Sequence, residues 1–224
     1  MFVPFSVSES AVNILAGPAD PSTPHVRTFC ERISPTEVPV RLPIRPEPGC
    51  QARECFANVR QKVARSGGRI RFGWAIWEWR RVFIEAEHHA VYEAPDGSLH
   101  DFTPSTPEDP QTARLFLPHD NVVYDFTNPD GSRRDNIRQA LTRDAQIDEY
   151  LQLASEFSQI MLRTPGTGEV TVYGDDAARL EFIAKRTARL KREIAQRYTA
   201  QGAPCYCGGG QKFKHCHGRP GRAR

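Results

Sequence analysis

The cysteine and histidine residues near the C-terminus constrain this chain more than any other feature of its sequence. Cys205, Cys207, Cys216 and His217 all lie within residues 203–219, which we call the C-terminal knuckle. A segment this short cannot bury a hydrophobic core of its own, so another interaction must hold it in one conformation. Three thiolates and one imidazole bind Zn²⁺ in tetrahedral structural sites. The sequence therefore predicts a structural zinc site whose four positions are all filled by protein side chains.

Three alternatives bear on the predicted zinc site: a disulfide within the knuckle, another histidine as ligand, and the cysteines outside the knuckle. The Cys-x-Cys spacing disfavours a disulfide inside the knuckle, and cysteines stay reduced in a cytoplasmic protein. His215 is the alternative to His217 as the fourth ligand. Cys30 and Cys50 show no ligand spacing, and we interpret both as structural or incidental residues.

Length and composition predict a globular protein with one sizeable domain and a small appendage. The chain has 224 residues, of which 25% are charged and 39% hydrophobic. No apolar run approaches the roughly 18 residues needed to span a membrane, and the N-terminus lacks the basic region of a secretory signal. We therefore expect a cytoplasmic protein. Its formal net charge is +3, and basic residues gather from Arg179 onward, where they form either a contact for nucleic acid or a solvated helix face.

Hydrophobic periodicity predicts a mixed α+β fold, with an antiparallel sheet, a Cys-bearing helix, a helical C-terminal part and the knuckle. The first helix begins near Pro48 and carries Cys55, and apolar residues then alternate as in β-strands. The predicted strands are residues 69–81, 82–94, 98–104, 115–118 and 121–126. The predicted later helices are residues 133–163, with a break near Thr142, and 175–201.

These elements predict five parts of the chain. They are an irregular N-terminal arm (1–47), an α+β core (48–130), a helical segment (131–202), the knuckle (203–219) and a basic tail (220–224).

A second group of chemically reactive residues lies in the α+β core. Cys55 falls in the first turns of a helix, His89 in a following strand and Asp101 in the next one. A helix N-terminus and a nearby imidazolium both favour the thiolate, which is the nucleophilic form of cysteine. A carboxylate can hold the imidazole in the required tautomer. The order therefore suggests a Cys-His-Asp catalytic set.

Other interpretations of the same region remain open at this point. Cys55 fits a buried small hydrophobic residue, and the histidines fit ordinary sheet residues. A second metal site is a further alternative, formed by Glu85, Glu87, His88, His89, His100 and Asp101. For an oxyanion hole, the side chain of Gln51 and the backbone N–H of Cys55 are candidates, and Gln51 is more simply a residue before the helix.

The knuckle resembles the SEC-C motif, the small zinc module at the C-terminus of the SecA motor and on many otherwise unrelated bacterial proteins. The resemblance covers residues 203–219, and Gly209 stands where the family usually has Ser. Besides the ligands it includes Gly208, Gly210, Lys212, Phe213, Lys214 and Gly218. It implies that the knuckle binds a partner, such as a protein or ribosome surface, with nucleic acid as a further partner of the basic C-terminal region.

The core resembles the transglutaminase-like branch of the papain-type thiol enzymes, over residues 50–104. It shares a His followed by a small and an apolar residue at 89–91, and an Asp-x-Thr sequence at 101–103. Val91 stands where the family often has Trp. The resemblance implies that Cys55 attacks an amide or ester carbonyl, with His89 as general acid and base and Asp101 orienting it. The alternative is a non-catalytic, zinc-dependent adaptor that binds the ribosome, nucleic acid or a protein.

Overall fold

The computed structural model describes residues 5–6, 16–106, 110–166, 170–207 and 210–219. The predicted basic tail, together with Gly208 and Gly209 of the knuckle, lies outside these residues. The chain divides into two compact units. The sheet unit contains Gly17–Glu78 and Ile84–Arg138, and the helical unit contains Met1–Ala16, Trp79–Phe83 and Gln139–Arg224.

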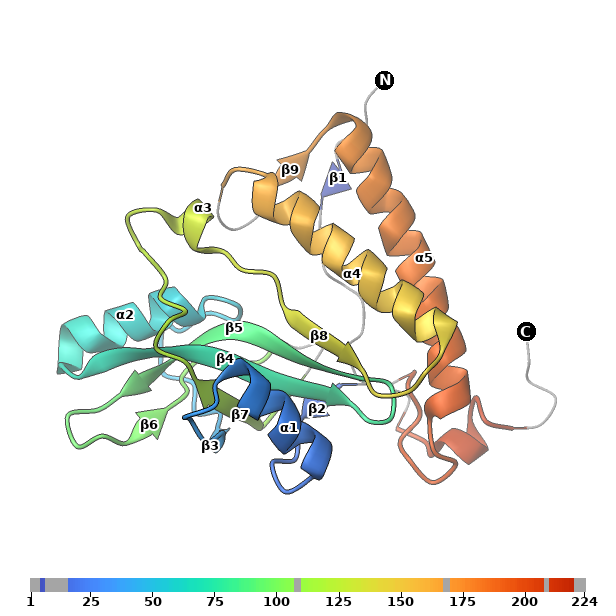
Figure 1. Cartoon of the computed structure of the whole chain (residues 1–224), viewed down its shortest axis with the longest axis horizontal. Helices are drawn as coiled ribbons and strands as arrows, with labels where there is room; N and C mark the ends of the chain where they lie inside the picture. The colour runs from blue at the N-terminus through green and yellow to red at the C-terminus, as the bar shows by residue number, and fades with distance from the viewer. Residues whose placement is uncertain (1–4, 7–15, 107–109, 167–169, 208–209, 220–224) are drawn as a thin grey trace. The chain divides into compact units, whose positions relative to one another are not determined.

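The sheet unit is built on two long neighbouring strands, β4 (Arg69–Trp79) and β5 (Phe83–Glu93). The strand order is β3-β7-β4-β5-β6, with β2 paired to β4 and β8 paired to β5 (Figure 1). The shorter strands are β2 (Gly17–Pro18), β3 (Val40–Pro43), β6 (Leu99–His100), β7 (Ala113–Pro118) and β8 (Ile137–Ala140). The pairings β3–β7, β4–β7, β5–β6 and β2–β4 are antiparallel, which confirms the predicted α+β class.

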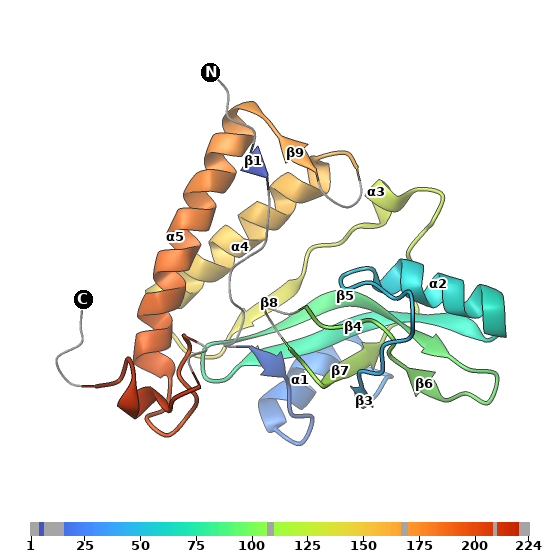
Figure 2. The same cartoon turned by 180° about the vertical axis from the view of Figure 1, so that it is seen from behind.

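Helices lie on both sides of this sheet. Figures 1 and 2 show α2 (Cys55–Ser66) above the sheet and α1 (Pro24–Ile33) below it. The fully buried Val59 of α2 packs with Ala90 and Tyr92 of β5 and with Phe102. Gly67 ends α2 at φ 69°, a conformation that favours glycine. This packing holds the first turn of α2 next to the strand that carries His89.

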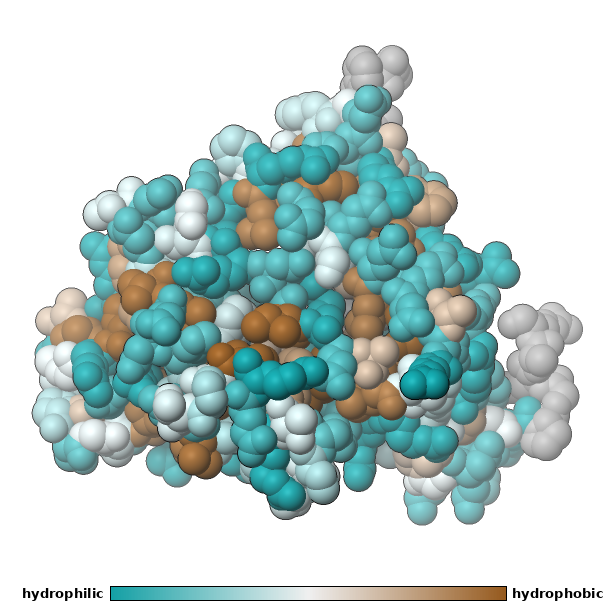
Figure 3. Space-filling view, viewed as in Figure 1, coloured by the Kyte–Doolittle hydropathy of each residue, from teal (hydrophilic) through white to brown (hydrophobic). Residues whose placement is uncertain are grey.

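The helical unit is formed by α4 (Ala145–Arg163) and α5 (Gly174–Tyr198). Their buried apolar side chains share one cluster with the end of β4, the turn after it and the start of β5. The cluster includes Trp79, Val82, Phe83, Ile147, Leu153, Ile160, Leu180, Ile183, Leu190 and Ile194. A short pair, β1 (Phe5–Ser6) with β9 (Thr171–Val172), accompanies the helices. The face of this unit visible in Figure 3 is mainly hydrophilic, as expected for two helices that bury one side each.

Four secondary-structure predictions were wrong. The helix predicted to begin near Pro48 begins only at Cys55. The segment predicted as an irregular arm contains α1, whose residues Val26, Phe29 and Cys30 are buried. The predicted helix from residue 133 begins only at Ala145, because residues 137–140 form β8 and pair with β5. Residues 121–126 form no strand. A short helix, α3 (Pro129–Ser132), follows them instead, with Asn128 accepting a hydrogen bond from the Gly131 N–H.

None of the helices in the described part of the chain combines the length and the hydrophobicity that a membrane span requires.

Candidate functional site

The structure brings the four predicted metal ligands of the knuckle together. One ligand atom from each of Cys205, Cys207, Cys216 and His217 lies within 4.8 Å of the other three. His217 Nδ1 is 3.3 Å from Cys205 Sγ and 3.4 Å from Cys216 Sγ, and the sulfurs of Cys207 and Cys216 are 3.6 Å apart. His215 is exposed and lies outside this group. Of the two candidate histidines, His217 is therefore the one positioned as a ligand.

These distances fit a tetrahedral metal ion. A Zn²⁺ ion with bonds of about 2.3 Å to sulfur and 2.0–2.1 Å to nitrogen places neighbouring ligand atoms roughly 3.5–3.8 Å apart. Burial opposes ionisation of Cys205, but backbone hydrogen bonds from Cys207 and His217 outweigh it and lower its pKa to about 6. The donor set is thus compact and favours at least one thiolate, the form that binds metal.

Backbone contacts and one aromatic side chain hold the knuckle around these ligands. The N–H of Cys205 donates to Gln211 O at 2.8 Å, and the N–H of Phe213 donates to Ala203 O at 2.8 Å. Phe213 is 2% exposed and is the first residue of a short 3₁₀ helix, Phe213–His215. A Cβ atom at Gly218 would lie 2.7 Å from the Phe213 ring, so only glycine fits there. Phe213 is therefore the buried apolar residue around which the described part of the knuckle folds.

In the sheet unit, Cys55 is the first residue of α2. No side chain caps this helix end, and the first N–H groups of a helix have no partner within it. Asn58 closes the preceding turn, since its amide accepts from the Gln51 N–H and donates to Gln51 O, at 3.0 and 2.8 Å. Arg53, two residues before the helix, has φ 67°, in the left-handed region that residues other than glycine seldom adopt. Cys55 itself is 6% exposed.

His89 and Asp101 are in direct contact. His89 Nε2 donates to Asp101 Oδ2 at 3.0 Å, and both side chains are buried. Cys55 lies near the same ring, since its charge and side chain contribute to raising the pKa of His89. Because one ring nitrogen is bonded to Asp101, the other, Nδ1, is the atom available to the thiol. The imidazole thus lies between a thiol and a carboxylate.

This arrangement favours the charged forms of the histidine and the aspartate. Burial opposes protonation of His89, but the charges of Asp101 and Cys55 and their hydrogen bonds outweigh it and raise its pKa to about 10. Burial likewise opposes ionisation of Asp101. The charge and hydrogen bond of His89, followed by those of Arg114, outweigh it and lower the Asp101 pKa to about 2. The raised pKa of His89 thus favours the imidazolium at neutral pH, and an imidazolium stabilises a neighbouring thiolate.

Sequence reasoning missed the residues that hold Asp101 in place. Arg114 Nη1 donates to Asp101 Oδ2 at 2.7 Å, and the Thr103 N–H donates to Asp101 Oδ1 at 2.9 Å. Asn58 Nδ2 donates to Thr103 Oγ1 at 3.3 Å, which links the Cys55 helix to the Asp101 segment. The Asp-x-Thr sequence contained a signal for Thr103, whereas nothing local marks Arg114 or Asn58.

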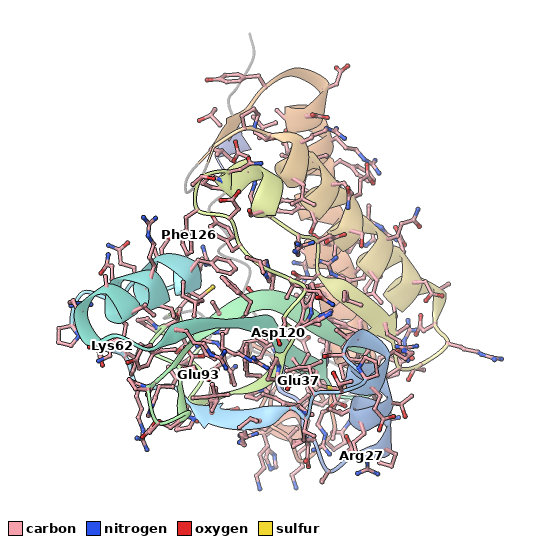
Figure 4. The ribbon with its side chains drawn as sticks, turned by 60° about the vertical axis from the view of Figure 1, so that its left-hand side comes forward. Arg27, Glu37, Lys62, Glu93, Asp120 and Phe126 are labelled. Atoms are coloured by element: carbon pink, nitrogen blue, oxygen red, sulfur yellow. The ribbon has the colours of Figure 1, made fainter. Side chains whose placement is uncertain are left out.

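Aromatic residues beyond β7 border the start of α2. The ring of Tyr124 stacks on Phe56, the residue after Cys55, with centroids 4.2 Å apart and planes 11° apart. Arg60 lies over the ring of Phe126 at 4.8 Å, and Figure 4 shows Phe126 next to α2. Burial and the charges of Glu54 and Cys55 raise the pKa of the Tyr124 phenol. Tyr124 therefore packs on the residue next to Cys55, where the sequence had suggested only a strand.

The structure does not support the alternative metal site in the core. Glu85 Oε2 accepts from Asn136 and Arg138, and Glu87 accepts from the Trp77 indole. His88 Nε2 donates to the Val122 carbonyl, and His100 contacts Ser98. Within the described ranges, the knuckle is the one group of three or more His, Cys, Asp or Glu residues close enough to hold a metal.

Comparison of the chain with protein-family models, with curated proteins and with solved structures finds no match. The functional argument therefore depends on the two sites themselves.

Proposed function

We propose that this protein is a thiol-dependent enzyme that acts on amide or ester bonds. The observation that supports this most is the hydrogen bond of 3.0 Å from His89 Nε2 to Asp101 Oδ2, with Cys55 near enough to raise the pKa of the His89 ring. Cys55 is the nucleophile, His89 the general acid and base, and Asp101 the group that orients His89. This arrangement is what a transglutaminase-like or papain-type thiol enzyme requires.

The chemistry follows from these roles. The Cys55 thiolate attacks the carbonyl carbon, a C–S bond forms, and the carbonyl π electrons move to oxygen. The N–H groups at the start of α2, that of Cys55 first, are donors for this oxyanion. The imidazolium gives its proton to the leaving amine or alcohol as the C–N or C–O bond breaks. Neutral His89 then takes a proton from water or from an acceptor amine. The oxygen or nitrogen of that molecule attacks the thioester carbon, the C–S bond breaks, and the Cys55 thiolate is released.

Alkylation of native protein with iodoacetamide between pH 5 and 9, read by peptide mass spectrometry, tests this proposal. Cys55 should react at pH 6 roughly tenfold or more faster in the wild type than in His89→Ala, since an imidazolium stabilises the thiolate. Cys30 is an internal reference, because burial and Glu31 raise its pKa to about 11. A Cys55 that reacts equally in both proteins, or that reacts only in urea, contradicts an enzyme activated by His89.

For the knuckle we propose that the bound metal is structural Zn²⁺ and that the segment is a SEC-C-type module. Four protein ligands leave no position for a substrate, which favours a structural role. Lys212 and Lys214 are exposed, and in the described residues neither forms an ion pair. They suit the acidic surface of a protein or of the ribosome. Cytoplasmic localisation stays part of this proposal.

Zinc-dependent binding without catalysis is the second candidate function, and the exposed lysines of the knuckle favour it. The two candidates differ in one variant. Cys55→Ala abolishes the function of a thiol enzyme and leaves that of an adaptor intact. Removal of zinc abolishes binding by an adaptor.

A further inference from the structure

Arg114 is a buried cation beside the candidate thiol site, and the Cys-His-Asp set gives it no role. It lies on β7, is 7% exposed, and its guanidinium lies 5.9 Å from the Trp77 ring. Its Nη1 donates to Asp101 Oδ2 at 2.7 Å and to Thr103 O at 2.8 Å. In the described part of the chain, Asp101 is the one carboxylate with which it forms an ion pair.

Arg114 and His89 bind the same carboxylate oxygen. Oδ2 of Asp101 accepts from Arg114 at 2.7 Å and from His89 Nε2 at 3.0 Å. The two cations are therefore close neighbours in a buried site, where charges act over short distances with little screening. Arg114 keeps its charge at every accessible pH, whereas His89 must lose and regain a proton during catalysis.

Arg114 also fixes the position of the carboxylate. It joins Asp101 Oδ2 to the carbonyl of Thr103, while the Thr103 N–H holds Oδ1. Asp101 thus cannot rotate away from His89 without breaking several hydrogen bonds. The groups that face His89 are Cys55 from α2, Asp101 and Arg114, with His88 beside it on β5 and the Phe116 ring against it.

We propose that Arg114 is a positioning residue of the thiol site, which holds Asp101 against His89 and weakens, as a permanent cation, the attraction between Asp101 and the imidazolium. This inference rests on the proposed thiol function. If Asp101 bonded to His89 alone, the pKa of His89 would be higher still. The imidazolium would then give its proton to a leaving group more slowly, because general acids work best with a pKa near the working pH. Arg114 thus offsets part of the stabilisation that Asp101 gives to the protonated form of His89.

The experiment compares Arg114→Gln and Arg114→Lys with Arg138→Gln. Gln keeps a hydrogen-bond donor without the charge, and Lys keeps the charge without the fork that bridges two acceptors. Arg138 is the control, because it forms partly buried ion pairs with two carboxylates other than Asp101, those of Glu85 at 3.1 Å and Asp135 at 2.7 Å. The first measurement is the protonation midpoint of His89 by NMR of ¹³C-labelled histidine, assigned with His89→Gln. The second is the alkylation rate of Cys55.

We expect Arg114→Gln to raise the His89 midpoint by about one pH unit or more, because a nearby positive charge is lost. Arg114→Lys and Arg138→Gln should leave the midpoint near the wild-type value. A folded Arg114→Gln protein with the wild-type midpoint overturns the proposal. So does failure of both Arg114 variants to fold in a buffer where Arg138→Gln folds, because the role of Arg114 is then structural alone.

The two measurements separate this inference from the proposed function. If Cys55 is unreactive and the His89 midpoint is nevertheless raised in Arg114→Gln, the proposed thiol enzyme is contradicted, whereas the effect of Arg114 on His89 is supported. A reactive Cys55 whose pH profile is unchanged in Arg114→Gln contradicts the role of Arg114 alone.

Discussion

The knuckle and the Cys55 site use the same two residue types in opposite ways. In the knuckle, three cysteines and His217 come from one short segment, and their ligand atoms lie within 4.8 Å of one another. In the sheet unit, one cysteine and one histidine come from α2 and β5, and Asp101 follows β6. Local sequence spacing assembles the first group, and the packing of a whole unit assembles the second.

The difference shows what each site needs to stay together. The knuckle has few buried side chains, with Cys205 and Phe213 at 2% exposure, so we expect the proposed metal to supply most of its stability. The Cys55 site has a sheet beneath it and hydrogen bonds from Thr103 and Arg114 around Asp101. It should therefore keep its geometry when the metal is removed.

Removal of one ligand from the knuckle tests this difference most strongly. Cys216→Ser should lose the zinc found by elemental mass spectrometry and unfold residues 203–219, because structural zinc contributes on the order of 10 kcal/mol. Hydrogen exchange should become fast at the N–H groups of Cys205 and Phe213, which are bonded to Gln211 and Ala203. Cys55 alkylation should stay at the wild-type rate.

Cys50→Ser is the matched control, since Cys50 is a free cysteine outside the cluster. It should keep one zinc per chain and slow exchange in the knuckle. A Cys216→Ser protein that still protects these two N–H groups would show that protein contacts alone hold the knuckle.

Loss of the Asp101 charge should have the next largest effect, on the sheet unit. Asp101→Asn leaves Arg114 and His89 buried without their carboxylate, and removal of one partner from a buried ion pair costs about 3–5 kcal/mol. The free energy of unfolding in urea measures this loss. Asp96→Asn is the control, because Asp96 is exposed in a turn and its side chain accepts hydrogen bonds from Ser98. Equal stability of the two variants would contradict a strong role for the Asp101 network.

The two sites also differ in how much of each the sequence predicted. The four ligands of the knuckle were recognisable because their contacts are local. The Cys-His-Asp order suggested the second site, and the long strands β4 and β5 followed from alternating apolar residues. Arg114 was not predictable, because its partner Asp101 lies on another element and charged residues are rarely buried.

Two errors in the fold have physical causes. In α1, Val26, Phe29 and Cys30 have helical spacing, but the surrounding proline, serine and threonine residues suggested an irregular chain. In residues 133–163, Ile137 and Leu141 are four residues apart as in a helix. Pairing with β5 nevertheless makes residues 137–140 a strand, so a tertiary contact overrides the local pattern.

Stability should depend on pH through His89. The pKa of His89 is about 10 in the folded state and about 6.5 in the unfolded chain. The stabilisation that its protonation adds is therefore complete below about pH 6.5 and is lost as the pH rises towards 10. The free energy of unfolding should fall by up to about 1.4 kcal/mol per pH unit in this range. Asp101 acts at the other end, where its stabilisation is lost as the pH falls from about 4 towards 2.

Urea unfolding of wild type and His89→Gln at pH 6, 7, 8 and 9 measures the alkaline effect. The variant should lose the slope between pH 6.5 and 10, because it has no proton to release there. Equal slopes in the two proteins would contradict a His89 that stays protonated in the folded state.

The smallest expected effect concerns the basic face of α5. Arg179 and Arg186 each form two hydrogen bonds of 2.6 Å to a glutamate of α4, Glu156 and Glu149 respectively. The Arg179 pair is exposed to solvent and adds little to stability, so Arg179→Gln should leave the urea midpoint unchanged. The charges within each pair nevertheless neutralise one another, so this face should attract polyanions less than Lys212 and Lys214 of the knuckle do.

Retention on heparin separates the two surfaces. Lys212→Gln with Lys214→Gln should elute at lower salt than the wild type. Each lost contact with a sulfate lowers the number of counterions that heparin releases on binding, and this release drives the binding. Glu149→Gln with Glu156→Gln should elute at higher salt, since it frees two arginines on α5. If the lysine variant elutes with the wild type while Arg179→Gln with Arg186→Gln elutes earlier, the basic helix rather than the knuckle is the surface that binds polyanions.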